Sequence, residues 1–195
     1  MTEALTAERV LEAAEDTLRR FGPGKTTVVD VARALGVSHG SVYRHFPNKA
    51  ALRDAVAERW LERVNARLWP LTTADGSATE RLRSWLEQLS TTKRLMARED
   101  PELFATYHAL ATDSRDVIRV HLDTLAGMLA RIISDGVSQG EFEVEDPHRA
   151  ARAVLTATTR FHNPAHAAEW EEPGLDADFE EVWALLLLGL ASGRR

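Results

Sequence analysis

The spacing of its apolar residues constrains this chain more than any other feature. Apolar side chains recur at three- and four-residue steps along almost the whole length, and no window of four to eight residues combines apolar/polar alternation with β-branched enrichment. The first pattern is typical of amphipathic helices, whereas the second would indicate strands. The sequence therefore predicts an all-α fold.

Start and stop signals divide this pattern into about nine helices. Gly22-Pro23-Gly24 predicts the end of the first helix, Gly36 that of the second and Phe46-Pro47 that of the third. Asp100-Pro101 and Asp146-Pro147 each place an acidic N-cap before a proline at the first helical position. The expected helices cover about residues 7–21, 27–35, 38–46, 48–70, 79–98, 102–111, 114–138, 147–161 and 178–190.

The composition is that of an ordinary globular protein. The chain has 195 residues, of which 44% are hydrophobic and 28% charged, so neither a disordered chain nor a coiled-coil rod is expected. Its longest apolar run, from Trp183 to Ala191, is about half of the roughly 20 residues that a membrane-spanning helix needs. It has no cysteine, and its first residues, which include Glu3 and Glu8, hold no apolar stretch, which argues against a secretory signal. We therefore expect a cytoplasmic protein without disulfides, thiolate metal sites or a membrane partner.

Charge is distributed unevenly along the chain. The formal net charge is −6, but residues 18–53 hold seven Lys and Arg against one acid, Asp30, and so carry +6. The remaining residues therefore sum to −12. A compact basic patch on an acidic protein favours a nucleic-acid contact, although a cluster on a solvated face explains the same charges.

Residues 26–52 carry the pattern of a helix-turn-helix. Two short helices are joined at Gly36-Val37-Ser38, so the second helix can enter the major groove of DNA. The small residues Gly40 and Ser41 allow close approach to base edges, and Arg44 can donate two hydrogen bonds to guanine. A small core is expected from Val31, Ala32, Leu35, Val37 and Val42 together with Leu18 and Phe21.

Two further residues suggest phosphate contacts. Lys49 stands at the start of a helix, where the helix dipole disfavours a cation and a bound anion would resolve the conflict. Tyr43 can donate its hydroxyl to the same strand. The alternatives are that Lys49 is a solvated surface residue and that Tyr43 is a half-buried core aromatic.

Taken together, these residues resemble the DNA-binding domain of TetR-family transcriptional regulators. The matching residues are Thr27, Asp30-Val31-Ala32, Gly36-Val37-Ser38, Ser41-Val42-Tyr43, His45-Phe46, Asn48-Lys49 and Leu52, in register over about 25 residues. The resemblance implies a DNA-binding domain over residues 1–50 and a domain over 51–195 that binds a small effector and dimerises. DNA contacts are then expected from Thr27, Ser38, His39, Gly40, Ser41, Tyr43, Arg44, His45 and Lys49. Some members have a base-reading arginine where this chain has Val29, so that contact is not expected here.

The second domain is rich in aromatic residues, which suggests an apolar pocket for an amphipathic ligand. Simple filling of the core explains the same residues equally well. The candidate lining residues are Trp60, Trp85, Leu89, Phe104, Tyr107, His108, His121, Leu125 and Phe161.

The last two helices carry broad apolar surfaces that fit a dimer interface. Pairing them across a twofold axis makes a four-helix bundle. The expected interface residues are Val154, Ala157, Val182, Leu185, Leu186, Gly189 and Leu190.

The histidines and acids do not form a recognisable catalytic or metal-binding motif. His162 and His166 have ligand spacing, but Asn163-Pro164 interrupts the helix that would align them, so a kink or helix end is favoured. We find no phosphate loop, nucleophile elbow or zinc-protease motif. Neither a cofactor, a metal nor an enzymatic activity is therefore expected.

The sequence thus predicts a homodimeric transcriptional regulator, in this family most often a repressor, that a small molecule releases from a palindromic operator. A helical enzyme that processes small molecules and keeps a vestigial helix-turn-helix is the main alternative. A third hypothesis, a sequence-tolerant architectural DNA protein, predicts a broadly basic chain, which the net charge of −6 opposes.

Overall fold

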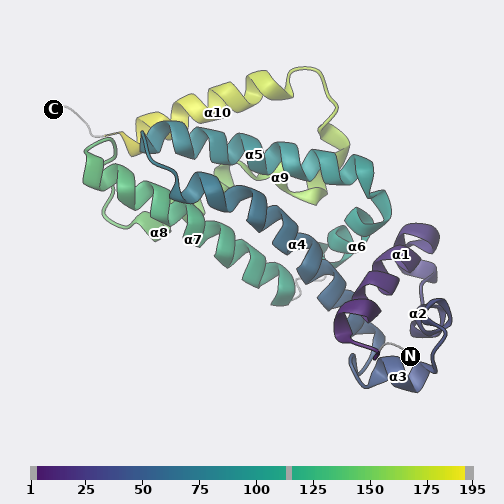
Figure 1. Cartoon of the computed structure of the whole chain (residues 1–195). Coiled ribbons are helices and arrows are strands. Elements are labelled where there is room, and N and C mark those ends of the chain that lie inside the picture. Colours follow the sequence, from purple (N-terminus) through teal and green to yellow (C-terminus); the bar gives the residue numbers. More distant parts are fainter. Residues whose placement is uncertain (1–3, 113–115, 192–195) are drawn as a thin grey trace. The chain divides into compact units, whose positions relative to one another are not determined.

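The computed structural model describes residues 4–112 and 116–191, and these ranges form ten α-helices, one 3-10 helix and no named strand (Figure 1). The predicted all-α fold is confirmed. Two differences from the expected helices lie near the C-terminus. The segment expected as one helix over 147–161 is α8 (Pro147–Ala157) followed by α9 (Thr159–His162), and a 3-10 helix, η1 (Pro164–Glu169), comes next.

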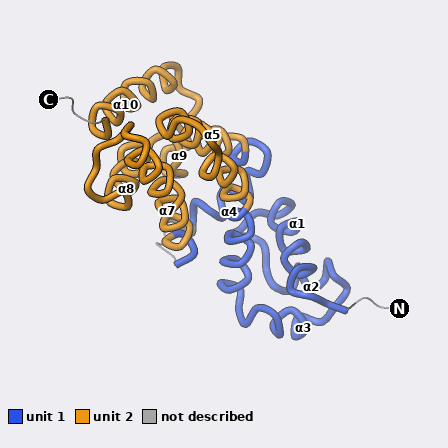
Figure 2. The backbone as a smooth tube through the Cα atoms, turned by 60° about the vertical axis from the view of Figure 1, so that its left-hand side comes forward, with its two compact units in different colours: residues 1–62, 96–118 blue, residues 63–95, 119–195 orange. Residues whose placement is uncertain are grey.

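The chain forms two compact units (Figure 2). Unit 1 comprises Met1–Glu62 and Met96–Ile118, and unit 2 comprises Arg63–Leu95 and Arg119–Arg195. Residues 96–118 thus group with the N-terminal helices. The domain boundary near residue 50 stays a prediction from the sequence.

Unit 1 is built around the N-terminal helices α1 (Ala7–Lys25), α2 (Val28–Leu35) and α3 (His39–Tyr43). It also includes the first part of α4 (Lys49–Thr73) and α6 (Pro101–Thr112). Helix α1 packs on both α2 and α6, and α2 packs on α3. The Arg19 guanidinium donates to Asp100 Oδ1 at 2.7 Å and so joins α1 to the start of α6.

Helix α1 bends where its end was expected. Gly22 has φ 74°, and a Cβ built there would come within 2.6 Å of a Glu102 carboxylate oxygen. The positive φ is what favours a glycine here, whereas the flexible Glu102 side chain could move away from a Cβ. Phe21, expected in the three-helix core, is 49% exposed, and its ring lies 5.3 Å from the Arg20 guanidinium carbon. That core assignment was wrong: Phe21 directly precedes the bend, and its ring lies against the Arg20 side chain at the surface instead of in the core.

Helix α4 continues past Pro70, where the sequence suggested its end. A proline deprives the carbonyl four residues earlier of its hydrogen bond. Here that residue is Ala66, which is exposed, so water can serve its carbonyl. In the next turn, the hydroxyl groups of Thr72 and Thr73 donate hydrogen bonds to the backbone carbonyls of Leu68 and Trp69.

Unit 2 contains the rest of α4 and most of α5 (Ala78–Glu99) and α7 (Asp116–Gln139), with α8, α9, η1 and α10 (Leu175–Leu190). Helices α5 and α7 run antiparallel, since Arg81 pairs with Asp135 at 2.8 Å and Lys93 meets His121 at 3.3 Å. Their buried side chains supply much of the core, which includes Leu82, Trp85, Leu89, Leu125, Leu129, Ile132 and Ile133.

The start of α5 is capped from a distant part of unit 2. Glu141 accepts hydrogen bonds from the backbone N–H groups of Ala78 and Thr79 at 3.0 and 2.9 Å and from the Ser77 hydroxyl at 2.8 Å. Although burial alone would raise the pKa of Glu141, these bonds lower it below its usual value.

None of the helices in the described ranges is long and apolar enough to cross a membrane.

Candidate DNA-binding surface and effector-binding region

The helix-turn-helix begins with a complete capping box on α2. The Thr27 hydroxyl oxygen accepts from the Asp30 N–H at 3.2 Å, and the Asp30 carboxylate accepts from the Thr27 N–H at 3.1 Å. Hydrogen bonding from Thr27 is the main reason that the pKa of Asp30 lies below its usual value. The box fixes the point where the chain enters α2, and it leaves Thr27 exposed.

The turn between α2 and α3 uses a left-handed glycine. Gly36 has φ 66°, and its N–H bonds to carbonyls in the last turn of α2. Ser38 then caps α3, accepting from the Ser41 N–H at 3.3 Å. The predicted turn and both cap residues are therefore present.

One side of α3 is buried and the other is exposed. Val42 is fully buried, with Val31, Ala32 and Leu18 also in the core, while Leu35 and Val37 are only partly buried. Helix α3 has five residues and is shorter than expected, so Arg44 and His45 follow its end. Of the predicted DNA contacts, Ser41 is partly buried and the others are exposed: Thr27, Ser38, His39, Gly40, Tyr43, Arg44, His45 and Lys49.

Two cations in this surface remain available to an anion. Arg44 donates to the Ser41 hydroxyl at 3.2 Å, and neither Arg44 nor Lys49 forms an ion pair with any described residue. By contrast, Arg33 is paired with Asp30 at 3.1 Å. Not all of the basic window is therefore free to meet phosphates.

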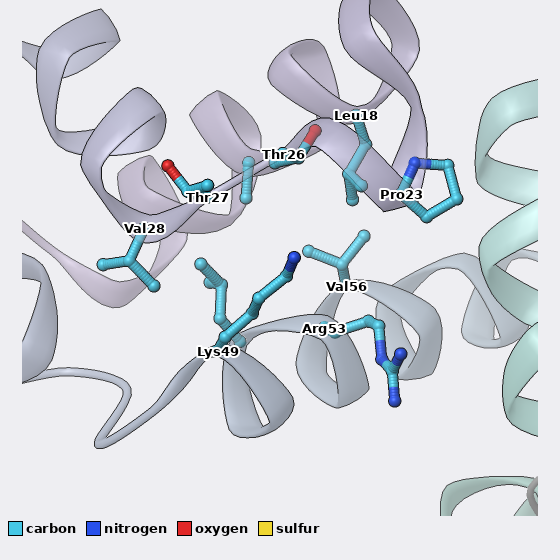
Figure 3. A pocket seen from close by; sticks show the side chains of 10 residues that line it. Leu18, Pro23, Thr26, Thr27, Val28, Lys49, Arg53 and Val56 are labelled. Carbon is cyan, nitrogen blue, oxygen red and sulfur yellow. The ribbon is translucent and has the colours of Figure 1, made fainter.

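A small apolar hollow lies beside Lys49 (Figure 3). Its lining includes Leu18, Leu52 and Val56, with Thr26 and Thr27 from the start of α2. The Lys49 side chain extends over this hollow toward Thr26, whereas the Arg53 guanidinium is directed away from it. Lys49 thus lines the hollow while the residue as a whole stays exposed.

The predicted ligand-lining residues fall into two groups. In unit 1, Trp60, Phe104 and Tyr107 form a buried aromatic cluster with ring centroids 5.1 to 6.2 Å apart, and His108 is exposed. Burial raises the pKa of Tyr107 above its usual value. In unit 2, five candidates are buried: Trp85, Leu89, His121, Leu125 and Phe161.

Unit 2 also buries a basic cluster that the sequence analysis did not identify as a whole. The Lys93 ammonium nitrogen lies 3.3 Å from His121 Nε2, and the side chains of Lys93 and His121 are 1% and 3% exposed. His162 is 7% exposed, and its Nε2 lies 3.4 Å from the Thr158 hydroxyl. We name Lys93, His121 and His162 the basic cluster.

Burial and mutual repulsion keep this cluster from being fully charged. Desolvation lowers the pKa of Lys93 to about 7 and that of His162 to about 4. Desolvation, followed by the charges of Lys93 and His162, lowers the pKa of His121 well below its usual value. His121 is therefore neutral and accepts a hydrogen bond at Nε2 from Lys93. The sequence held one signal for Lys93, because it continues the buried four-residue step of Trp85 and Leu89.

The predicted dimer residues are not all available to a partner. Val154 and Leu190 are 1% and 5% exposed within the chain, which places them in its own core. Val182 and Leu186 are partly buried, while Ala157, Leu185 and Gly189 are exposed. Leu188, absent from the prediction, is 78% exposed beside Leu185, which is 69% exposed.

The segment around the paired histidines ends a helix, as expected. Helix α9 ends at His162, and η1 starts at Pro164, so His162 and His166 lie on different elements. His166 Nδ1 meets Glu169 at 2.7 Å. No group of three or more His, Cys, Asp or Glu residues among the described ones is arranged to hold a metal ion.

An exposed recognition helix on a buried trihelical core, attached to a larger helical unit, defines a helix-turn-helix DNA-binding regulator. The model of the bacterial regulatory proteins of the tetR family matches residues 10–56, and that of the tetracyclin repressor-like C-terminal domain matches residues 78–183. The chain belongs to the TetR family of transcriptional regulators.

Relatives and solved structures are similar to this protein over most of its length. An uncharacterized HTH-type transcriptional regulator of Mycobacterium tuberculosis is 26% identical over 175 residues, covering 90% of this chain and 83% of the relative. The nucleoid occlusion factor SlmA of Vibrio vulnificus is 27% identical and covers 92% of each chain. The crystal structure of RolR in complex with resorcinol has the same fold, with a TM-score of 0.66, 18% identity and coverage of 94% and 86%.

Proposed function

We propose that this chain is a homodimeric repressor that binds a palindromic operator and leaves it when a small molecule binds in unit 2. The observation that carries this proposal is the exposed surface of α3 and its flanks over the buried Val42. Family membership supports the regulatory role, and the ligand in the RolR crystal structure illustrates a small molecule bound to a protein of this fold.

DNA is read by residues on and beside α3. His39, Ser41, Arg44 and His45 face base edges, with Arg44 leaving the Ser41 hydroxyl to donate to a guanine. Lys49 and Tyr43 hold phosphates, while Thr27 and Ser38 border the same surface. Phosphate contacts fix the register of the protein, and base contacts select the sequence.

Dimerisation uses the exposed side of the last helix. Ala184, Leu185 and Leu188 recur at three- and four-residue steps and form one exposed apolar stripe on α10. Ala153 and Ala157 on α8 are exposed and small, and α8 contacts α10. Two copies of this surface, related by a twofold axis, bury both stripes in a four-helix bundle.

Release requires the effector to prefer a conformation that cannot span the operator. The two recognition helices must enter successive major grooves, whose centres are about 34–36 Å apart. An effector that shifts the equilibrium from 1:99 to 99:1 must bind the non-spanning conformation roughly 10⁴-fold more tightly.

The decisive experiment is selection of bound sequences from a random double-stranded DNA pool. The proposal predicts an enriched palindrome whose half-sites lie one helical turn, or a multiple of it, apart. Enrichment of a single half-site would contradict the dimer, and no enrichment would contradict operator binding.

An enzyme with a vestigial helix-turn-helix is the competing function. It predicts turnover of a bound compound and no sequence preference on DNA. The same purified protein, incubated with each compound that stabilises it and analysed by mass spectrometry, distinguishes the two. A chemically unchanged compound that releases the protein from DNA supports the regulator.

A further inference from the structure

The side chains that α5 and α7 bury together are ordered from apolar to basic. On α5, Trp85, Leu89 and Lys93 follow at four-residue steps and are 0%, 0% and 1% exposed. On α7, Leu129, Leu125 and His121 follow at the same step in the opposite chain direction and are 0%, 1% and 3% exposed. Each helix therefore has a buried stripe with one apolar and one basic end.

The two basic ends coincide because the helices are antiparallel. The Arg81–Asp135 ion pair at 2.8 Å and the Lys93–His121 contact at 3.3 Å set the register. In this register Leu89 on α5 faces Leu125 on α7, and one turn further from the basic end Trp85 faces Leu129. Eight helical residues correspond to about 12 Å, so an apolar region of this length leads up to the basic end.

A third helix completes the basic end. The Ser90 hydroxyl on α5 donates to the Phe161 carbonyl at 2.9 Å, which holds α9 against α5. His162 follows directly and is buried, and the charge of Lys93 acts on it. Three basic side chains from three helices thus share one buried region. Basic groups gathered in a protein interior repel each other when protonated, and an anion among them removes that repulsion.

The apolar end holds a further unsatisfied group. The Trp85 side chain is 0% exposed, and its indole N–H donates no hydrogen bond to a described residue. A buried donor without an acceptor costs stability, and burial of an indole usually comes with a partner for its N–H. An oxygen atom of a bound molecule can supply that acceptor.

From this arrangement we infer that the effector is an apolar monocarboxylate, whose acid group binds among Lys93, His121 and His162 and whose hydrocarbon body lies along the α5 and α7 stripes. The inference rests on the proposed function, since it names the chemical class of the effector in unit 2. Because the six stripe side chains are buried, the ligand has to move α5 relative to α7. Binding is therefore coupled to a rearrangement of unit 2.

Octanoate is the probe, with 1-octanol as its neutral match and octylamine as its cationic match. Isothermal titration calorimetry on the full chain is expected to give an affinity for octanoate at least about tenfold above that for octanol, which corresponds to about 1.4 kcal/mol, with octylamine weakest. Equal affinities for octanoate and octanol would overturn the inference.

The variant Lys93→Met tests the residue assignment. Methionine has a similar shape without charge, and apolar replacement of a buried charge is often tolerated. The variant is expected to lose the preference for octanoate and to keep its affinity for octanol, which also shows that it is folded. Lys25→Met, at an exposed lysine, is the matched control and is expected to keep the preference. A preference that survives in Lys93→Met contradicts the assignment.

Proton uptake gives a readout that simple packing would not produce. Because the pKa of Lys93 is about 7, part of its side chain is neutral at pH 7.5, and a carboxylate beside it draws a proton from solution. Octanoate titrations in two buffers of different ionisation enthalpy are expected to reveal this uptake in the parent and not in Lys93→Met. Binding without proton uptake in the parent contradicts ammonium–carboxylate pairing.

These outcomes can be separated from those of the proposed function. If the random-pool selection yields a palindrome but carboxylates show no preference, the regulator stands and the ligand class fails. If carboxylates bind through Lys93 but no DNA sequence is enriched, the operator proposal fails and the binding site stands.

Discussion

The ring of Phe161 on α9 meets the ring of Phe179 on α10 edge to face, with 5.3 Å between the ring centroids. One residue earlier on each helix, the Arg160 guanidinium donates to the Asp178 carboxylate at 2.5 Å. Helix α9 is thus joined to α10 by neighbouring apolar and ionic contacts. Since His162 on α9 belongs to the basic cluster, α9 joins that cluster to the helix proposed as the dimer surface.

The aromatic contact predicts a measurable coupling energy. Phe161→Leu and Phe179→Leu each remove a ring while keeping an apolar side chain, and the double-mutant cycle is expected to give about 0.5–1.5 kcal/mol of coupling in urea unfolding. Phe161→Leu combined with Phe142→Leu, at a buried ring near Gly136, is the control and should be additive within roughly 0.5 kcal/mol. Additivity in both cycles would mean that the ring contact contributes nothing beyond burial.

Lys49→Ala is expected to weaken binding to every DNA sequence alike. Lys49 is exposed at the start of α4 and forms no ion pair among the described residues, so its ammonium can replace a phosphate counterion. The slope of log affinity against log salt should fall by about one unit in fluorescence anisotropy titrations. Lys25→Ala, at an exposed lysine outside the predicted contacts, serves as the control. A loss confined to one base position would assign Lys49 to base reading instead.

Arg44→Ala is expected to act on one base pair. Loss of a bidentate contact to guanine should cost roughly 1–3 kcal/mol on the selected operator and relax the preference at one position in each half-site. Repeating the random-pool selection with the variant measures both effects. A uniform loss across sequences, with a smaller salt slope, would show that Arg44 contacts phosphate.

Leu188→Glu is expected to convert the dimer to a folded monomer. Leu188 is 78% exposed, so glutamate costs little in the single chain but places a charge in the proposed bundle. Sedimentation velocity measures the oligomeric state, and circular dichroism measures the fold. Leu122→Glu, at a 45% exposed leucine on α7, is the matched control and should leave the dimer intact. A dimeric Leu188→Glu protein would exclude α10 from the interface.

The helix-turn-helix could be predicted in detail because its signals are local. Thr27 with Asp30, the left-handed Gly36 and the cap at Ser38 each specify the backbone within a few residues, and the structure contains all three. Gly22-Pro23-Gly24 likewise marked the position of the bend in α1, but the exposure of Phe21 was not predicted, since the side of a helix that is covered depends on segments far away in the sequence. Local chemistry therefore determined the helix boundaries better than it determined which side of α1 is buried.

The basic cluster and the dimer surface depend on contacts between distant segments. Lys93 lies at the helical spacing of core residues, but its side chain is of a charged type that is usually exposed. Only its contact with His121 reveals the cluster. In the same way, the apolar pattern of α8 and α10 gave no means to separate Val154, which is buried in the chain, from Ala157, which is exposed. The sequence pattern of an apolar stripe is the same whether the stripe packs within its own chain or against a second copy.

Acidification is expected to destabilise the protein through His162. Its folded-state pKa of about 4 lies below the usual 6.5, so between these values the unfolded chain binds more protons than the folded one. The free energy of unfolding should therefore fall as the pH drops from 6.5 to 4, by up to roughly 3 kcal/mol from this group, and level off below 4. His121, whose pKa is also lowered, adds to the fall in the same direction.

The variant His162→Gln isolates this contribution. Glutamine does not titrate, and its amide can still donate to the Thr158 hydroxyl, which itself donates to the Val154 carbonyl at 2.8 Å. Urea unfolding at several pH values is expected to show a shallower loss of stability in the variant than in the parent. His39→Gln, at an exposed histidine on α3, should follow the parent curve. If His162→Gln loses stability as steeply as the parent, His162 is already protonated in the fold and the basic cluster carries more charge than its burial implies.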